Sequence, residues 1–410
     1  MKQIVKYILY IIPAIVFSGC SGLADENPYS DALNTLTIVP TYPEGLEDIP
    51  SEGVSVHISD MDKGVEYSLK TGPDGKAYAK VTNGNYRITV SFRTDEFIFN
   101  GSADRVRITG EDKNLSVNMT VAEPGKIVIK EIYCGGCLKY PQEGNYQSDS
   151  YIILHNNTDQ TQYLDSLCIG TLDPYNAVGT NVWIGKDENG ASVFQDFAPV
   201  IQAVWKIKGD GKTFPLKPGE DAVICIFGAI DHTVQYPMSV NLNKPDYFVC
   251  YNLEYFPNTK YHPVPGDKIL PERHLEVVIK TGQAKAYTFS FSSPAVVIFK
   301  AKGTTVEKFV SNENSLMQKP GSNVDKIVRL PLDWIIDGVE VFTGNASGNT
   351  KRINPAIDAG YVKFSAPFMG HTLFRKTDEA GTEKKGFEVL EDTNNSMNDF
   401  YEREKQSLHE

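Results

Sequence analysis

The chain has 410 residues and a formal net charge of -12, a length that allows two or three domains with a substantial core. Aromatic residues make up 11% and charged residues 22% of the chain, which is typical of a globular protein rather than a disordered one. An acidic chain without a Lys/Arg run would repel phosphate backbones, so we expect no nucleic-acid partner.

The first nineteen residues predict a secretory signal. Lys2 and Lys6 precede an apolar run at residues 8–17, which is too short and ends too sharply for a stable membrane span. The tetrapeptide FSGC at 17–20 resembles a bacterial lipobox, which implies cleavage before Cys20 and lipidation of its thiol, with palmitate among the attached lipids. The alternative is an ordinary cleaved signal followed by a chance cysteine.

Residues 20–31 are small, polar and acidic, which predicts a flexible tether. Their acidic character is loosely similar to the surface-export signal of lipoproteins in Bacteroidota. We therefore expect a lipid anchor in the outer membrane, with the cell surface favoured over the periplasmic face.

Residues 32–122 predict a first β-sandwich. Apolar and polar residues alternate at 54–58 and 86–92, and the turn signals GPDG and NGN occur at 72–75 and 83–85. Short strands between such turns favour a sandwich of about seven antiparallel strands. The stretch 71–90 resembles the transthyretin-like modules found beside carboxypeptidases, and this resemblance implies a spacer or docking unit without chemistry of its own.

Residues 126–400 predict a second, larger β domain after the boundary EPG at 123–125. The run at 127–132 is apolar on both faces, as a central strand would be, and strands at 151–155 and 163–169 follow it. The polar residues at 156–159 form a turn between the last two strands.

Several motifs of this domain resemble the lamin-tail domain, an immunoglobulin-like sandwich. They are IKEI at 129–132, YIILHN at 151–156, FPLKPGE at 214–220, WIIDGVEVF at 334–342 and GHTLFR at 370–375. Ile153 departs from the family, which usually has Glu there. The resemblance implies an all-β domain enlarged by insertions at 173–212 and 229–325, followed by a charged tail at 401–410.

The whole chain also resembles a family of Bacteroidota outer-membrane lipoproteins of unknown function. Members of that family are suspected to work beside TonB-dependent outer-membrane receptors. The resemblance implies a location and a class of partner, and it supplies no mechanism.

Cys134 and Cys137 lie in a CGGC loop after the first strand of the larger domain. A secreted protein can form a disulfide there, because two glycines give the backbone freedom to close a small ring. Paired thiolates that bind a soft metal, a redox site and two unrelated thiols are the alternatives. We favour the local disulfide.

A second candidate site is the aromatic, proline-rich loop at 236–266. Exposed rings on such a loop would offer a flat binding surface, but a lid packed on the sandwich is the favoured interpretation. Two tryptophans in the other insertion have the same two interpretations. The candidate residues are Tyr247, Tyr251, Tyr255, Phe256, Tyr261, His262, Trp183 and Trp205.

No catalytic motif is present in the sequence, and the seven histidines are scattered. The turn at 392–399 has oxygen ligands that could hold calcium, although a solvated turn is the favoured interpretation. We therefore expect a noncatalytic protein without a cofactor, which binds a ligand or a receptor as an accessory to nutrient uptake. Metal handling by Cys134 and Cys137 is the second hypothesis and an unrecognised enzyme is the third.

Overall fold

The computed structural model describes residues 33–409 apart from 47, 95, 189–191 and 345–347. Strands arranged in several sheets dominate it, and the predicted all-β class is confirmed. The predicted signal peptide, the tether and Cys20 lie outside the described residues. Within the described ranges, no helix combines the length and the apolar character needed to cross a membrane.

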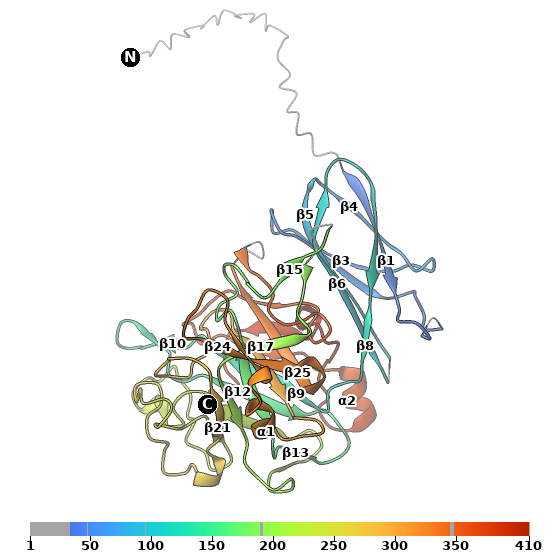
Figure 1. The fold of residues 1–410 in the computed structure, drawn as a ribbon. Helices are drawn as coiled ribbons and strands as arrows, with labels where there is room; N and C mark the ends of the chain where they lie inside the picture. Colours follow the sequence, from blue (N-terminus) through green and yellow to red (C-terminus); the bar gives the residue numbers. More distant parts are fainter. Residues whose placement is uncertain (1–32, 47, 95, 189–191, 345–347, 410) are drawn as a thin grey trace, which may run out of the picture.

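The N-terminal module consists of two sheets that share one apolar core (Figure 1). The alternating pattern of the sequence places Leu36 and Ile38 of one sheet, and Val56 and Ile58 of the other, in that core. Strands β1 and β7 pair in parallel, and the module has eight strands where the sequence predicted about seven. The first sheet has the order β4 (Ala77–Val81), β1 (Asn34–Thr41), β7 (Lys113–Asn118). The second has the order β3 (Glu66–Lys70), β2 (Ser55–Asp60), β5 (Gly84–Arg93), β6 (Ile98–Ile108), β8 (Thr120–Ala122).

The larger domain contains two further sheets. The six-stranded sheet has the order β20 (Phe248–Val249), β19 (Asp221–Cys225), β12 (Tyr151–Asn156), β9 (Ile127–Tyr133), β27 (Thr372–Arg375), β28 (Phe400–Arg403). The eight-stranded sheet has the order β23 (Leu316–Gln318), β24 (Lys326–Pro331), β17 (Phe197–Lys206), β14 (Cys168–Leu172), β22 (Ala295–Phe299), β25 (Ile335–Thr343), β26 (Val362–Phe364), and β21 (Glu276–Lys280) also pairs with β17.

Short elements complete the domain. Three two-stranded sheets pair β10 (Cys137–Leu138) with β11 (Asn145–Tyr146), β13 (Gln162–Tyr163) with β18 (Pro215–Leu216), and β15 (Gly185–Lys186) with β16 (Ser192–Val193). The α-helices are α1 (Val306–Val310), α2 (Glu379–Lys385) and α3 (Ser396–Asp399). The 3-10 turns are η1 (His232–Val234), η2 (Pro271–Arg273), η3 (Glu313–Ser315) and η4 (Leu332–Trp334).

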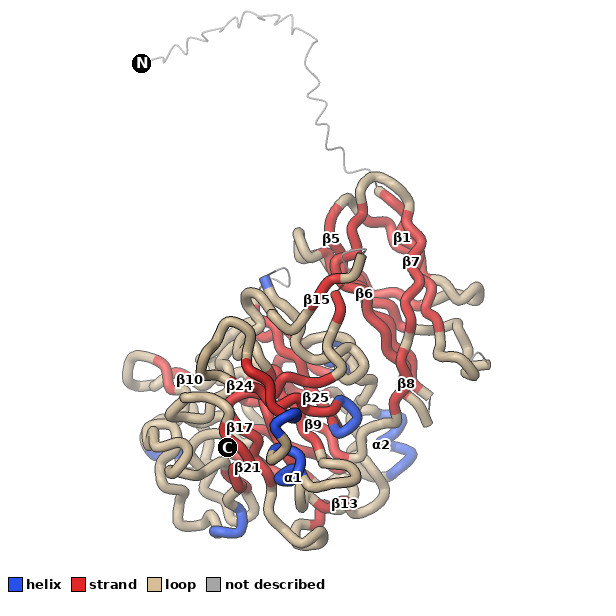
Figure 2. Tube along the Cα trace, viewed as in Figure 1, coloured by secondary structure: helices blue, strands red, loops and turns tan. Residues whose placement is uncertain are grey.

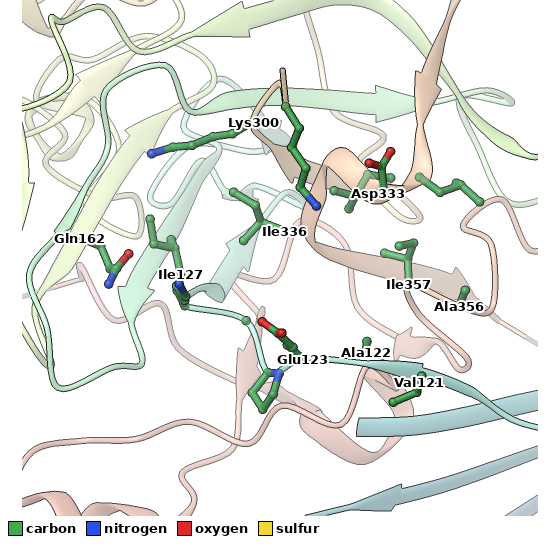
Figure 3. Close-up of a pocket in the computed structure, with 16 residues that line it drawn as sticks. Val121, Ala122, Glu123, Ile127, Gln162, Lys300, Asp333, Ile336, Ala356 and Ile357 are labelled. Atoms are coloured by element: carbon green, nitrogen blue, oxygen red, sulfur yellow. The ribbon is translucent and has the colours of Figure 1, made fainter. Parts of the chain in front are cut away.

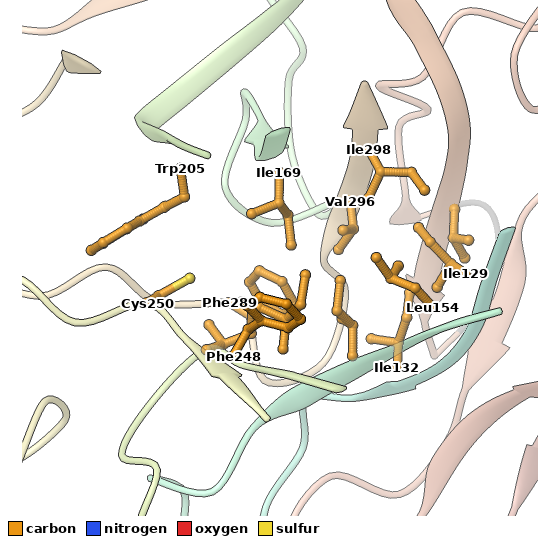
Figure 4. Packing of buried hydrophobic residues seen from close by; sticks show 14 of the residues in the cluster. Ile129, Ile132, Leu154, Ile169, Trp205, Phe248, Cys250, Phe289, Val296 and Ile298 are labelled. Atoms are coloured by element: carbon orange, nitrogen blue, oxygen red, sulfur yellow. The ribbon is translucent and has the colours of Figure 1, made fainter. Parts of the chain in front are cut away.

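The largest core cluster lies between these two sheets. Figure 4 shows Ile129, Ile132 and Leu154 from the six-stranded sheet with Val296 and Ile298 from the eight-stranded sheet. All five side chains are fully buried. Each contributes about 1.5–3 kcal/mol relative to an exposed side chain, so the cluster is a main source of the domain's stability.

Both predicted insertions contribute strands to the eight-stranded sheet. Strand β17 lies within 173–212, and β22, within 229–325, lies between β14 and β25 in the eight-stranded sheet. The run AVVIF at 295–299 is buried throughout, as a central strand requires. The first residues of the predicted charged tail belong to β28, which pairs with β27 at the edge of the six-stranded sheet.

The N-terminal module lies against the larger domain (Figure 2). Buried polar and aromatic side chains form the contacts between them. The guanidinium carbon of Arg87 lies 5.1 Å from the ring centroid of Phe342 and 5.4 Å from that of Tyr361. Asn395 donates to the hydroxyl of Ser91 at 2.8 Å. A desolvated cation over two rings is worth about 2 kcal/mol, so these contacts fix the module in place.

Candidate functional site

The CGGC loop contains two separate free thiols, and the expected disulfide is not formed in this structure. The Sγ of Cys134 approaches the carbonyl of Phe291 at 4.0 Å, whereas that of Cys137 approaches Oδ2 of Asp149 at 3.8 Å. The glycines serve close packing instead of ring closure. Gly136 has φ +73°, and a Cβ there would collide with the backbone around Tyr146.

The surroundings of these thiols disfavour both metal and redox chemistry. Burial raises the pKa of the Cys134 thiol and raises that of Cys137 to about 12, so neither thiol ionises readily. Across the described ranges, no group of three or more His, Cys, Asp or Glu is placed to hold a metal ion. The second hypothesis therefore gains no support from the loop.

We expect the five cysteines of the described chain to resist a thiol reagent in the native protein. All five are buried: Cys134, Cys137, Cys168, Cys225 and Cys250. In denaturant without reductant, each should become alkylated within minutes, because each is a thiol. Mass spectrometry of the alkylated peptides is the measurement. Unmodified Cys134 and Cys137 joined in one cross-linked peptide would contradict the free-thiol assignment.

Of the two interpretations of the aromatic loop at 236–266, the packed lid describes most of its rings better than the exposed binding surface does. Phe256 is fully buried and stacks on Trp205, with ring centroids 5.5 Å apart and an interplanar angle of 26°. His262 is buried and its Nε2 accepts a hydrogen bond from the Tyr287 amide at 3.1 Å. Burial lowers the pKa of His262 to about 4, which keeps the ring neutral.

The remaining candidate residues are also mostly buried or half-buried. Trp183 is also buried, and its indole donates to Asp173 at 2.8 Å. Tyr247, Tyr251 and Tyr261 are half-buried against the core clusters. Tyr255 is 38% exposed, so it alone of the eight candidates presents a largely open ring in the described chain.

The turn at 392–399 is buried, which corrects the expectation of a solvated turn. Asp392 and Asp399 each lie 3.5 Å from the guanidinium of Arg375, and Asp337 lies 2.5 Å from it. The guanidinium therefore supplies the positive charge among these carboxylates. The sequence pattern did not reveal Arg375 or Asp337, because both come from strands distant in the chain.

A cleft of about 680 Å³ lies where the N-terminal module joins the larger domain. Figure 3 shows Ile127, Ile336 and Ile357 around this space, with Val121 and Ala122 from the junction. Val121 is 41% exposed. Ligand sites commonly have volumes of 300–1,000 Å³ and prefer domain junctions, so the cleft is the best candidate site of the described chain.

Polar groups surround the apolar floor of the cleft. Lys300 donates to the carbonyl of Tyr163 at 2.6 Å, and burial lowers the pKa of its ammonium. Lys126, Lys302 and Gln162 line the same space, with the carboxylates of Glu123 and Asp333. None of the residues described around the cleft is a Ser, Thr, Cys or His. This arrangement can bind a ligand or a peptide, and it offers no nucleophile with an adjacent imidazole base.

The cleft is not visible in the sequence, because five separate segments build it. They are the junction at 121–127, Gln162 of β13, the loop at 300–302, residues 332–336 around η4, and the loop at 356–357. The boundary signal EPG at 123–125 was the one local hint, since junctions between domains often hold ligands.

Residues 217–407 match the model of a family described as "Protein of unknown function (DUF4876)". The chain is also similar to the crystal structure of a DUF4876 family protein from Bacteroides thetaiotaomicron at 2.50 Å resolution, with 23% sequence identity and a TM-score of 0.57. That likeness covers 91% of this chain and 96% of the other, and it shows the fold. No curated protein matches the chain.

The matched segment does not correspond to a complete structural unit. It begins just before β19, whereas β19 pairs with β12, and β22 pairs with β14. Both sheets of the larger domain therefore combine strands from before and after the start of the match.

Proposed function

We propose that this chain is a noncatalytic lipoprotein, anchored in the outer membrane through Cys20, that binds a ligand or a receptor partner through the junction cleft. The partner class is a TonB-dependent receptor, and the role is accessory to nutrient uptake on the cell surface. The signal and FSGC motif support the anchor, and the resemblance to a Bacteroidota lipoprotein family supports the partner class.

The cleft is the observation that carries the binding role. It joins exposed apolar atoms to a polar rim of lysines and carboxylates, and binding surfaces commonly combine an apolar centre with a polar rim. Because the N-terminal module is already docked, the cleft exists before a ligand binds. The free energy of binding is therefore not reduced by a cost of closing the cleft.

Val121→Asp is expected to reduce recovery of an outer-membrane partner at least about tenfold. The new carboxylate would line the cleft, where an apolar partner group would have to desolvate it. The measurement is pull-down of the tagged, full-length protein from detergent-solubilised outer membrane, with the β-barrel proteins quantified by mass spectrometry.

Val264→Asp is the matched control, because Val264 is 69% exposed on the aromatic loop and does not line the cleft. Its partner recovery should equal that of the wild type. If Val264→Asp alone reduced recovery of the partner, the binding surface would be on the aromatic loop instead of in the cleft. Recovery of no β-barrel protein by the wild type would oppose the receptor role, and retention of Cys20→Ser in the membrane fraction would oppose the anchor.

A further inference from the structure

A second, smaller cavity of about 290 Å³ lies at another part of the module junction. Strands β5 and β6 of the N-terminal module form one wall, and the β15 hairpin with residues 349–350 of the larger domain forms the other. Its charged lining residues are Arg87, Asp104, Arg105 and Lys186. The cavity is separate from the cleft described above, since no residue lines both.

A β-bulge places two of these charges beside the cavity. Tyr86 pairs with Val106 and Ile88 pairs with Ala103, so Arg87 of β5 opposes both Asp104 and Arg105 of β6. Arg105 has φ 58°, a left-handed conformation that is costly for a residue other than glycine. Bulges of this kind redirect side chains next to functional sites, and backbone strain tends to persist where function requires it.

Arg87 supplies a buried cation with unused hydrogen-bonding capacity. It is 3% exposed, and its Nε donates to Asp104. Its Nη1 has no hydrogen-bond partner among the described residues. A buried guanidinium N–H without an acceptor costs free energy, which an added oxyanion would offset.

The charges of this cavity are unbalanced in favour of cations. Asp104 neutralises Arg87, and the cationic side chains of Arg105 and Lys186 remain without a carboxylate within ion-pair distance in the described chain. Two uncompensated positive charges suit a dianion better than a single carboxylate. Arginine and lysine together are the usual partners of such groups.

We propose that this cavity binds the phosphate or sulfate group of a ligand. Arg105 and Lys186 contact the oxyanion, Arg87 donates its free Nη1 N–H to it, and the β-bulge opposite Arg87 positions Arg105 beside the cavity. The inference is independent of the membrane anchor and of the receptor partner, because it concerns different residues at a different cavity.

Phosphate and sulfate are expected to raise the melting temperature of the full-length protein above its value in chloride of equal ionic strength. The measurement is thermal unfolding at about pH 8, where a phosphomonoester is dianionic, followed by calorimetric titration with inorganic phosphate. Arg105→Gln should weaken phosphate binding at least about tenfold through loss of a charge-assisted contact. Arg105→Gly should weaken binding equally while raising the melting temperature of the free protein, since glycine tolerates the positive φ.

Arg107→Gln is the matched control, because Arg107 is exposed on the same strand and does not line the cavity. Its phosphate affinity should match that of the wild type. Glycerol 3-phosphate and phosphatidic acid vesicles then distinguish a soluble ligand from a lipid headgroup, both carrying the same phosphomonoester. Equal unfolding in phosphate, sulfate and chloride would overturn the proposal, as would equal losses of affinity in Arg105→Gln and Arg107→Gln.

Discussion

Arg352→Met is expected to lower the free energy of unfolding by about 3–5 kcal/mol, the range for removal of one partner of a buried ion pair. Arg352 and Glu340 are both fully buried, and the Nη2–Oε1 distance is 2.6 Å. The guanidinium also donates to four backbone carbonyls, those of Pro174, Tyr175, Ser293 and Val341. Methionine fills a similar volume, and it leaves Oε1 of Glu340 and these carbonyls without their side-chain donor, while Oε2 keeps the backbone amides of residues 352 and 353.

Urea unfolding of both proteins, followed by tryptophan fluorescence, measures the difference. Lys217→Met serves as the control, since Lys217 pairs with Glu220 at 3.3 Å on the surface and its loss should cost less than about 1 kcal/mol. Adding Glu340→Gln to Arg352→Met should recover part of the loss, because it removes the unpaired charge. A loss below about 1 kcal/mol for Arg352→Met would refute the structural role assigned to this pair.

The class of fold was accessible from the sequence because strand patterns are local. Residues 127–132 and 151–155 were predicted as strands from their apolar runs, and they are neighbouring strands of one sheet. The central position of β22 was not predicted, because β22 lies between segments that resemble lamin-tail motifs and has no such motif itself. An apolar run such as AVVIF at 295–299 was itself a signal for a buried strand.

The candidate site was harder to predict because spacing in the sequence does not reveal burial. Cys134 and Cys137 are three positions apart, yet their side chains contact different groups, Phe291 and Asp149. The aromatic loop was ambiguous for a related reason: composition alone cannot separate an exposed ring from one stacked on Trp205. The junction cleft and the Arg105 bulge depend on how the two modules dock, which no local pattern encodes.

Asp399→Asn is expected to make stability less dependent on pH between about pH 6.5 and 8. Burial raises the pKa of Asp399 to about 7, with Asp392 adding to the rise and Arg375 opposing it. The folded state thus holds a proton that the unfolded state has already lost, and stability falls as pH rises through the folded pKa. One such proton changes the free energy of unfolding by at most about 1.4 kcal/mol per pH unit. The wild type should therefore be about 1 kcal/mol less stable at the upper end of this window than at the lower end. The variant should show a much smaller difference.

Comparison of the wild type with the variant isolates Asp399, because the other groups with shifted pKa values, among them Asp149 and Asp337 at about 6, are present in both proteins. His232 and His262 have pKa values lowered to about 4, which makes stability rise with pH only up to about the ordinary histidine pKa of 6.5. Asp165→Asn is the control. Burial alone would raise the pKa of this carboxyl, but hydrogen bonds from backbone amides and a hydroxyl lower it below its ordinary value. That variant should be less stable throughout the window with an unchanged slope. If Asp399→Asn kept the wild-type slope of stability against pH, Asp399 would have to be ionised throughout this range. The Arg375 guanidinium would then stabilise the charge of Asp399 more strongly than burial opposes it.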